Sequence, residues 1–256
     1  MRRLRTLVRL ARLAGVIAIG LSLACGLSLR ARLGRPAPQA TRQRLCRWFL
    51  ARLTAALPVE VRLTGERPTR PMLWLANHQS WSDIPLLGML VPMTFLAKAE
   101  VRQWPLLGWL AAQAGTRFIQ RGQGDTLALG RQLGDHLRQG RNLLIFPEGT
   151  TTDGTSLRPF HPRLLACAVE TATPIQPVAI RYLRDGQPDP IAPFVGDDDL
   201  LSHLFRLMAH DRAIVEIHLL PPIDTTTMER SRLGRLCHAQ IHEVLFGEPP
   251  ALRQAA

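Results

Sequence analysis

The amino-acid sequence predicts an α/β fold in which helices flank a mostly parallel central sheet, preceded by a membrane-associated helical hairpin. Short apolar runs alternate with helical stretches from Val59 onward, a pattern typical of parallel sheets. An uncharged segment, Leu13 to Leu29, lies between clusters of arginines near the N-terminus. The 256 residues suffice for one substantial domain with short additions. We therefore expect membrane-anchoring helices over residues 1–57 and one α/β domain over residues 58–256.

The uncharged segment is a marginal membrane span. As a helix, Leu13 to Leu29 would cover about 25 Å, slightly less than the ~30 Å hydrocarbon core. Arginines on both sides conflict with the positive-inside rule for a complete crossing. A hairpin anchored in one leaflet removes this conflict, whereas a cleaved signal peptide is an alternative reading of the same pattern. The sequence leaves open whether the segment crosses the bilayer or lies in one leaflet.

A second helix is expected after the breaker at residues 35–38. Residues 40–57 place Leu45, Trp48, Phe49, Leu53 and Leu57 on one helical face, with the arginines largely elsewhere. This pattern favours a basic amphipathic helix that lies on a membrane. The alternative is an ordinary surface helix packed on the domain.

The remaining elements follow from the period of the apolar residues and from their flanking residues. Strands are expected at 59–63, 72–76, 93–97, 116–119, 143–146, 175–180 and 214–220. Helices are expected at 82–90, 100–114, 125–139, 162–171, 200–210 and 227–246.

Charge and composition restrict the partners. The formal net charge is +12, and the basic residues flank the apolar N-terminal segment. This arrangement indicates an anionic phospholipid membrane, whereas a nucleic-acid reader would interleave aromatic residues with the charge. Aromatic residues make up only 5% of the chain, so we expect no nucleic-acid partner. The four cysteines lack zinc-binding spacing and are predicted to be free, buried thiols.

An acid/base pair is the strongest chemical candidate. His78 and Asp83 lie five positions apart in Asn-His-Gln-Ser-Trp-Ser-Asp, just after an apolar run. On one straight helix these two side chains would point about 140° apart, so a turn must separate them. We therefore predict His78 in a strand-to-helix loop and Asp83 in the first helical turn. Such a His can take a proton from a hydroxyl while the carboxylate orients it.

Three further loops follow predicted strands and carry groups suited to a phosphorylated acceptor. Arg121 could grip a phosphate, and Glu148 could bind hydroxyls or orient Arg121. Gly149 permits a tight turn and close ligand approach. The block from Pro174 to Pro177 is interpreted as structural, or as a wall for a fatty chain. Nucleotide-binding glycine loops and the serine-hydrolase elbow are absent from the sequence.

In these four ordered blocks the chain resembles the lysophosphatidate acyltransferases and related glycerolipid acyltransferases over roughly residues 60 to 220. The blocks are His78-x4-Asp83, Phe118-x-x-Arg121, Phe146-Pro-Glu-Gly-Thr150 and Pro174 to Pro177. The resemblance implies a glycerolipid acyltransferase fold, with His78 as general base and Asp83 as its orienting partner. It also implies that Arg121, Glu148, Gly149 and Thr150 bind the acceptor substrate. Lys98, the single lysine, matches a basic position of the family.

One position departs from the family. After Glu-Gly-Thr the family usually has an arginine, but this chain has Thr151. The resemblance implies 1-acylglycerol-3-phosphate as the first acceptor, with phosphatidate as the product. Because a cation is missing at Thr151, the alternative acceptor is lyso-ornithine lipid, acylated by a bacterial branch that the chain may also resemble, including around Ile191 to Asp197.

The implied reaction is direct transfer of a fatty acyl group from acyl carrier protein or acyl-CoA to a lysolipid hydroxyl, as part of phospholipid or lipid biosynthesis. No cofactor and no metal are expected, and the thioester is a co-substrate. The expected location is the cytoplasmic face of the bacterial inner membrane. Alternatives of other classes are a lipid hydrolase, with water in place of the acceptor and a metal at Glu148 or Asp153, and a non-catalytic lipid-binding protein.

Overall fold

The computed structural model describes residues 2–104, 106–119 and 126–247. Its strands are β1 (Val59–Thr64), β2 (Leu73–Ala76), β3 (Met93–Lys98), β4 (Arg117–Ile119), β5 (Asn142–Ile145), β6 (Ile175–Arg184), β7 (Gln187–Pro188) and β8 (Ala213–Leu219). They form an eight-stranded sheet in the order β1-β8-β6-β2-β5-β3-β4, with β7 beside β6. The predicted α/β class and mostly parallel sheet are confirmed, and within the described residues only the pairings of β6 with β7 and with β8 are antiparallel.

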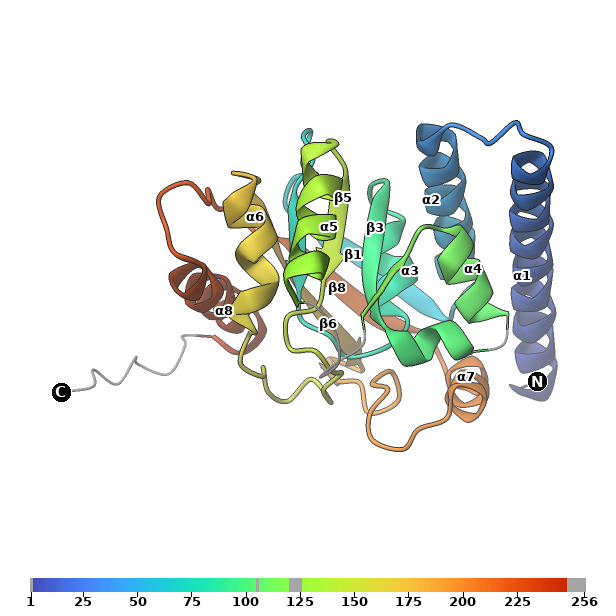
Figure 1. Ribbon diagram of the computed structural model, residues 1–256. Coiled ribbons are helices and arrows are strands. Elements are labelled where there is room, and N and C mark those ends of the chain that lie inside the picture. The colour runs from blue at the N-terminus through green and yellow to red at the C-terminus, as the bar shows by residue number, and fades with distance from the viewer. Residues whose placement is uncertain (1, 105, 120–125, 248–256) are drawn as a thin grey trace.

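Helices cover both faces of the sheet, which explains why every residue of the central strand β2 is buried. The helices are α1 (Arg2–Arg32), α2 (Gln39–Ala56), α3 (Asp83–Gly88), η1 (Ala99–Gln103), α4 (Leu107–Gln113), α5 (Thr126–Arg138), η2 (Pro162–Leu165), α6 (Ala166–Glu170), α7 (Leu200–Ala209) and α8 (Arg230–Phe246). Figure 1 shows α5, α6 and α8 on one side of the molecule and α1 to α4 on the other. Two separate apolar clusters fill the two layers.

Two expected elements differ in ways that concern the site. The helix expected at 100–114 is divided into η1 and α4, and the sequence has Pro105 between them, where a helix would lose a hydrogen bond. The strand expected at 175–180 continues to Arg184, because its last residues pair with β8 and β7. The extension adds Tyr182 to the sheet.

The first helix is longer than its apolar segment. α1 has 31 residues, so it extends about 46 Å. It has the length and composition of a membrane-crossing helix, with a mean hydropathy of 2.0 in its most apolar part. Both of its ends contact the α/β domain: Arg9 donates to the Met208 and His210 carbonyls, and Ser28 donates to Gln113. Cys25 on this helix is exposed, so the prediction that all four thiols are buried is wrong.

The second helix is packed between α1 and α3, as the alternative reading of residues 40–57 proposed (Figure 1). Leu50 points into the core of the domain, and the Phe49 ring lies against Gly20 of α1. Trp48 is exposed, with the Arg52 guanidinium over its ring. The division at residue 57 stays a prediction, and α2 ends one residue before it.

Candidate active site

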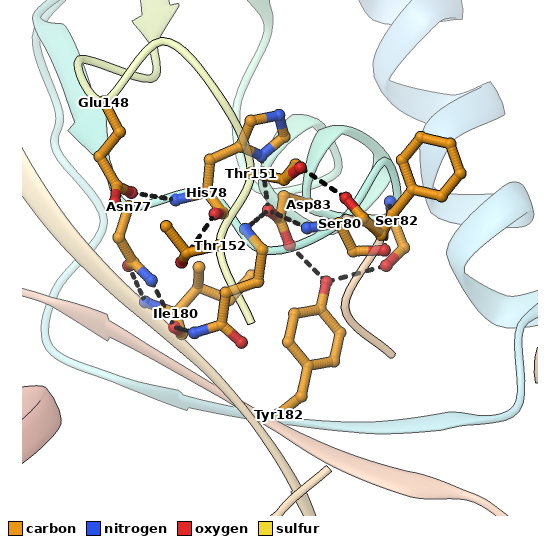
Figure 2. Close-up of polar contacts among 12 residues, drawn as sticks. Asn77, His78, Ser80, Ser82, Asp83, Glu148, Thr151, Thr152, Ile180 and Tyr182 are labelled. Carbon is orange, nitrogen blue, oxygen red and sulfur yellow. Dashed lines mark hydrogen bonds and ion pairs between the residues drawn. The ribbon is translucent and has the colours of Figure 1, made fainter. Parts of the chain in front are cut away.

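The His78–Asp83 pair has the predicted geometry. His78 lies in the loop after β2, and Asp83 is the first residue of α3. The Nδ1 atom of His78 is 2.7 Å from the Oδ2 atom of Asp83, as Figure 2 shows. Because an ionised carboxylate has no proton to give, Nδ1 carries the hydrogen and donates it. Nε2 is therefore the basic nitrogen, and no described residue forms a hydrogen bond with it.

Asp83 is completely buried and receives four donors. Its Oδ2 atom accepts a hydrogen bond from the His78 ring. The same atom accepts hydrogen bonds from the backbone N–H groups of Gln79 at 2.8 Å and of Ser80 at 3.0 Å. Its Oδ1 atom accepts the hydroxyl of Tyr182, which reaches it from β6. Hydrogen bonds of this kind compensate the cost of burying a charge. The carboxylate is thus held in one orientation toward His78.

The backbone of His78 is held on both sides. Its N–H donates to Glu148 at 2.8 Å, and its carbonyl accepts the N–H of Thr152 at 2.9 Å. The imidazole ring stacks on Phe146, with the ring centroids 3.8 Å apart and the planes 10° apart. The side chain is 18% exposed, which leaves one edge of the ring open to a substrate.

Glu148 connects two loops in this structure. One oxygen accepts the His78 N–H and the other accepts the Arg158 N–H at 2.9 Å. Burial raises the pKa of Glu148, while these two bonds lower it. Both oxygens therefore have protein partners, so the Glu148 side chain holds the backbone of His78 in place. Gly149 has a φ of 72°, which is the left-handed turn expected of a glycine there.

Asn77 fixes the same loop to the sheet, and sequence reasoning missed it. Its side-chain amide donates to the Ile180 carbonyl and accepts the Ile180 N–H, at 2.9 and 2.8 Å (Figure 2). Gln79 adds a bond to the same carbonyl at 3.1 Å. The sequence signals this anchor only by placing an asparagine directly before His78, because Ile180 is 103 residues away.

The segment after β7 covers the loop from a third side. The Thr151 hydroxyl donates a hydrogen bond to the Phe194 carbonyl, and the Phe194 N–H donates one to the backbone carbonyl of Gln79 at 2.8 Å. His203 of α7 accepts from the Trp81 indole at 2.9 Å and donates to the Pro193 carbonyl at 3.0 Å. Burial lowers the pKa of His203, in agreement with a neutral ring that both accepts and donates. The four bonds connect α7 and residues 191–197 to the His78 loop.

The predicted site also includes Arg121, Lys98 and Thr150. Arg121 lies outside the described residues, as does the side chain of Lys98, although the Lys98 backbone ends β3. Thr150 lies half-buried in the loop after Gly149. The prolines of the fourth block are structural: the Pro174 carbonyl accepts from Leu73 and the Pro177 carbonyl accepts from Leu220.

An apolar cavity of about 230 Å³ lies between the N-terminal helices and the α/β domain. Residues of α1, α2, α4 and α7 line it, together with Trp81 of the His78 loop and with Ile84 and Pro85 of α3. The Pro174 to Pro177 block does not line this cavity, and its alternative reading as a fatty-chain wall stays a prediction. Within the described ranges, no group of three His, Cys, Asp or Glu side chains could hold a metal ion.

Comparisons with known proteins agree with this geometry. A family model described as Acyltransferase matches residues 58–181. A lyso-ornithine lipid O-acyltransferase of Pseudomonas aeruginosa is 58% identical over 100% of both chains. A 1-acyl-sn-glycerol-3-phosphate acyltransferase of Neisseria gonorrhoeae is 30% identical over 68% of this chain and 70% of its own. The crystal structure of an LPA acyltransferase from Thermotoga maritima superposes with a TM-score of 0.64 at 22% identity, covering 95% and 98% of the two chains, which shows the shared fold.

Proposed function

The chain belongs to the acyltransferase family, and we propose that the lysolipid whose hydroxyl it acylates is lyso-ornithine lipid. The observation that carries the choice of acceptor is the full-length similarity to a protein of that name, at 58% identity. The sequence alone placed 1-acylglycerol-3-phosphate first. Relatives with that name are similar over a smaller part of the chain, at about 30% identity.

The proposed mechanism is direct acyl transfer with His78 as general base. Nε2 removes the proton of the acceptor hydroxyl as its oxygen attacks the thioester carbonyl. The C–S bond then breaks, and the thiolate of coenzyme A or of acyl carrier protein leaves and takes the proton from the His78 imidazolium. Asp83 stabilises the imidazolium that forms, since its Oδ2 atom lies 2.7 Å from Nδ1. General base catalysis typically contributes ~10²- to 10⁴-fold, so positioning of the two substrates supplies much of the remaining acceleration.

The surroundings of Thr151 support an acceptor without a phosphate. A phosphomonoester carries up to two negative charges and favours a nearby guanidinium, whereas ornithine presents an ammonium and a carboxylate. At position 151 this chain has a neutral hydroxyl that donates to Phe194, and the bond keeps residues 191–197 against the site. An arginine at 151 would add a charge and break this bond. Position 151 is therefore the proposed determinant of acceptor choice.

The substitution Thr151→Arg tests this choice. We expect the wild-type protein to acylate lyso-ornithine lipid faster than lysophosphatidate, and the variant to change the ratio of the two kcat/KM values at least ~10-fold toward lysophosphatidate, because a charge-assisted bond contributes ~1.5–3 kcal/mol. Radiolabelled acyl transfer to both lysolipids in mixed micelles measures the ratio.

Thr155→Arg is the matched control, because Thr155 lies exposed in the same loop, with its hydroxyl on Asp153. It adds the same charge without touching Phe194, and the acceptor ratio should stay within about twofold of wild type. A Thr151→Arg protein with an unchanged ratio would contradict the role of position 151. Wild-type preference for lysophosphatidate would contradict the proposed acceptor.

The acyl donor is proposed to be a thioester of acyl carrier protein or of coenzyme A, and the reaction as proposed uses no metal or further cofactor. The apolar cavity beside Trp81 is a suitable place for an acyl chain, because its lining is almost wholly aliphatic and aromatic. The same assay run with both donors, in the presence and absence of EDTA, distinguishes transfer from a metal-dependent hydrolase. Release of free fatty acid that stops with EDTA would favour the hydrolase.

The protein is membrane-associated, and we propose that it lies on the cytoplasmic face of the bacterial inner membrane with α1 in one leaflet. The support is the contact of both ends of α1 with the α/β domain, through Arg9 and Ser28. If α1 crossed the bilayer, the domain beside it would have to enter the hydrocarbon, where its loops and charges are costly.

Protease treatment of vesicles tests the single-leaflet arrangement. With an N-terminal epitope tag, we expect the tag and the C-terminus to be cleaved on the same side of sealed inverted membrane vesicles. A helix that crosses the bilayer would protect one of the two ends. Detergent-permeabilised vesicles, in which both ends are accessible, serve as the control for cleavage.

A further inference from the structure

Tyr182 lies at the centre of a buried hydrogen-bond chain that ends on the proposed base. It projects from β6, and its ring is among the buried core residues, at 2% exposure. Its hydroxyl contacts Asp83, which is 99 residues earlier in the sequence, and lies 2.8 Å from the Ser82 hydroxyl. Figure 2 shows the phenol pointing directly at the carboxylate that holds His78.

The direction of each hydrogen bond follows from the chemistry of the partners. Asp83 accepts from the His78 ring and therefore has no proton of its own to share, so Tyr182 is the donor to Oδ1. A phenol has one proton, so Ser82 donates to the Tyr182 oxygen. Burial, followed by the nearby Asp83 charge, raises the pKa of Tyr182 well above its usual value, which keeps the phenol protonated. The order is Ser82 to Tyr182 to Asp83 to His78.

We propose that Tyr182 is a positioning residue that acts on His78 through Asp83. The inference rests on the proposed role of His78 as base. The phenol blocks rotation of the carboxylate by occupying Oδ1, which leaves Oδ2 for the ring and for the N–H groups of Gln79 and Ser80. It also draws negative charge from Asp83, and so sets how tightly His78 holds the proton that it takes from the acceptor.

Other charges near Tyr182 are few and have partners of their own. Asp189 follows β7 and pairs with Arg184 at 2.9 Å. Glu148 accepts the His78 and Arg158 N–H groups and does not contact the phenol. Among the described residues, Asp83 is therefore the carboxylate that accepts the hydrogen bond from the Tyr182 hydroxyl. A phenylalanine would fill the same space, so packing alone does not explain the hydroxyl.

The substitution Tyr182→Phe removes the hydroxyl and keeps the ring. We expect kcat to fall about 10-fold with the KM of the lysolipid within about twofold, since loss of orientation can cost up to ~10²-fold. The acidic limb of the plot of kcat/KM against pH should move to higher pH. Without the hydrogen bond from Tyr182, the full negative charge of Asp83 holds the proton on His78 more tightly. Rates are normalised to the folded fraction measured by circular dichroism.

Fluorinated tyrosine gives an independent test without a mutation, because Tyr182 is the only tyrosine of the chain. Uniform incorporation of 3-fluorotyrosine therefore changes this single phenol. The more acidic phenol is a stronger donor, so the acidic limb should move to lower pH, opposite to the shift in Tyr182→Phe. Tyr182→Phe protein grown in the same medium contains no site for the label and is the matched control.

Thr225→Val controls for the loss of a buried hydroxyl elsewhere in the core. Thr225 is 1% exposed and donates to the Ala168 and Thr173 carbonyls, away from the site. The Thr225→Val variant should have a lower melting temperature than wild type and an unchanged pH profile of kcat/KM. If Tyr182→Phe behaves like Thr225→Val and fluorotyrosine moves nothing, the inference is overturned. If wild-type protein transfers no acyl group, or does so equally without His78, the proposed function fails instead.

Discussion

Replacing His78 with alanine is expected to lower kcat by about 10²- to 10⁴-fold, the usual contribution of a positioned general base. The ring is 18% exposed and contributes its Nε2 atom to no bond among the described residues, so the fold should tolerate its removal. We therefore expect a melting temperature close to that of wild type and little change in lysolipid binding. Steady-state transfer from acyl-ACP or acyl-CoA, with calorimetry on the same samples, measures both effects.

His161→Ala is the matched control, because His161 is an exposed histidine that lies near the site in sequence but outside the His78–Asp83 network. Its activity should stay within about twofold of wild type, in the range usual for surface substitutions. Transfer by His78→Ala at more than a tenth of the wild-type rate would contradict the assignment of the base.

Replacing Asp83 with asparagine is expected to lower kcat by about 10²- to 10³-fold while the packing is retained. The amide oxygen can occupy the Oδ2 position and accept from His78, Gln79 and Ser80. The amide nitrogen then faces Tyr182, whose oxygen can accept a hydrogen bond. The variant thus keeps the shape but loses the charge that stabilises the imidazolium. Single-turnover kinetics with saturating substrates measure this loss in the chemical step.

Asp135→Asn tests the effect of removing a carboxylate from the surface. Asp135 forms an exposed pair with Arg138 on α5, and such pairs contribute little to stability. We expect activity and melting temperature near those of wild type. An Asp83→Asn enzyme with a kcat within threefold of wild type would show that the charge of Asp83 is not needed for the reaction.

Seven of the eight strands were predictable because each has a strong local pattern, whereas the short strand β7 was not expected. The run from Leu73 to Ala76 is wholly apolar because it lies in the centre of a sheet with both faces covered, and the sequence displays that burial directly. The end of β6 was not predictable in this way. In residues 181–184, two arginines flank Tyr182 and Leu183, and these residues remain in the strand because β8 and β7 pair with them.

The site was predictable as a set of residues and only in part as a set of contacts. The pairing of His78 with Asp83 followed from a five-residue spacing across a turn, which is local information. The bonds from Asn77 to Ile180 and from Tyr182 to Asp83 join positions about 100 apart, so no spacing predicts them. Glu148 was expected to bind hydroxyls or to orient Arg121. Its hydrogen bonds with the backbone N–H groups of His78 and Arg158 depend on the contact between two loops, which the sequence does not show.

The contacts of the N-terminal helices with the rest of the protein were also not predictable from the sequence. The arginines around Leu13 to Leu29 indicated a membrane, but the contacts of Arg9 with α7 and of Leu50 with the core required the folded chain. Amphipathicity alone could not separate a helix that lies on lipid from one that lies on protein, because both bury one apolar face. In α2, that face lies partly against α1 and α3.

The sequence was enough to predict the fold class, the reaction class and His78 as the proposed base, because periodicity and short motifs encode local geometry. The tertiary structure decided how that base is held: by Glu148 and Thr152 at its backbone, by Phe146 at its ring, and by Asp83 with Tyr182 behind it. These contacts depend on parallel strands bringing distant loops to one edge of the sheet, an arrangement that no single segment of the chain contains.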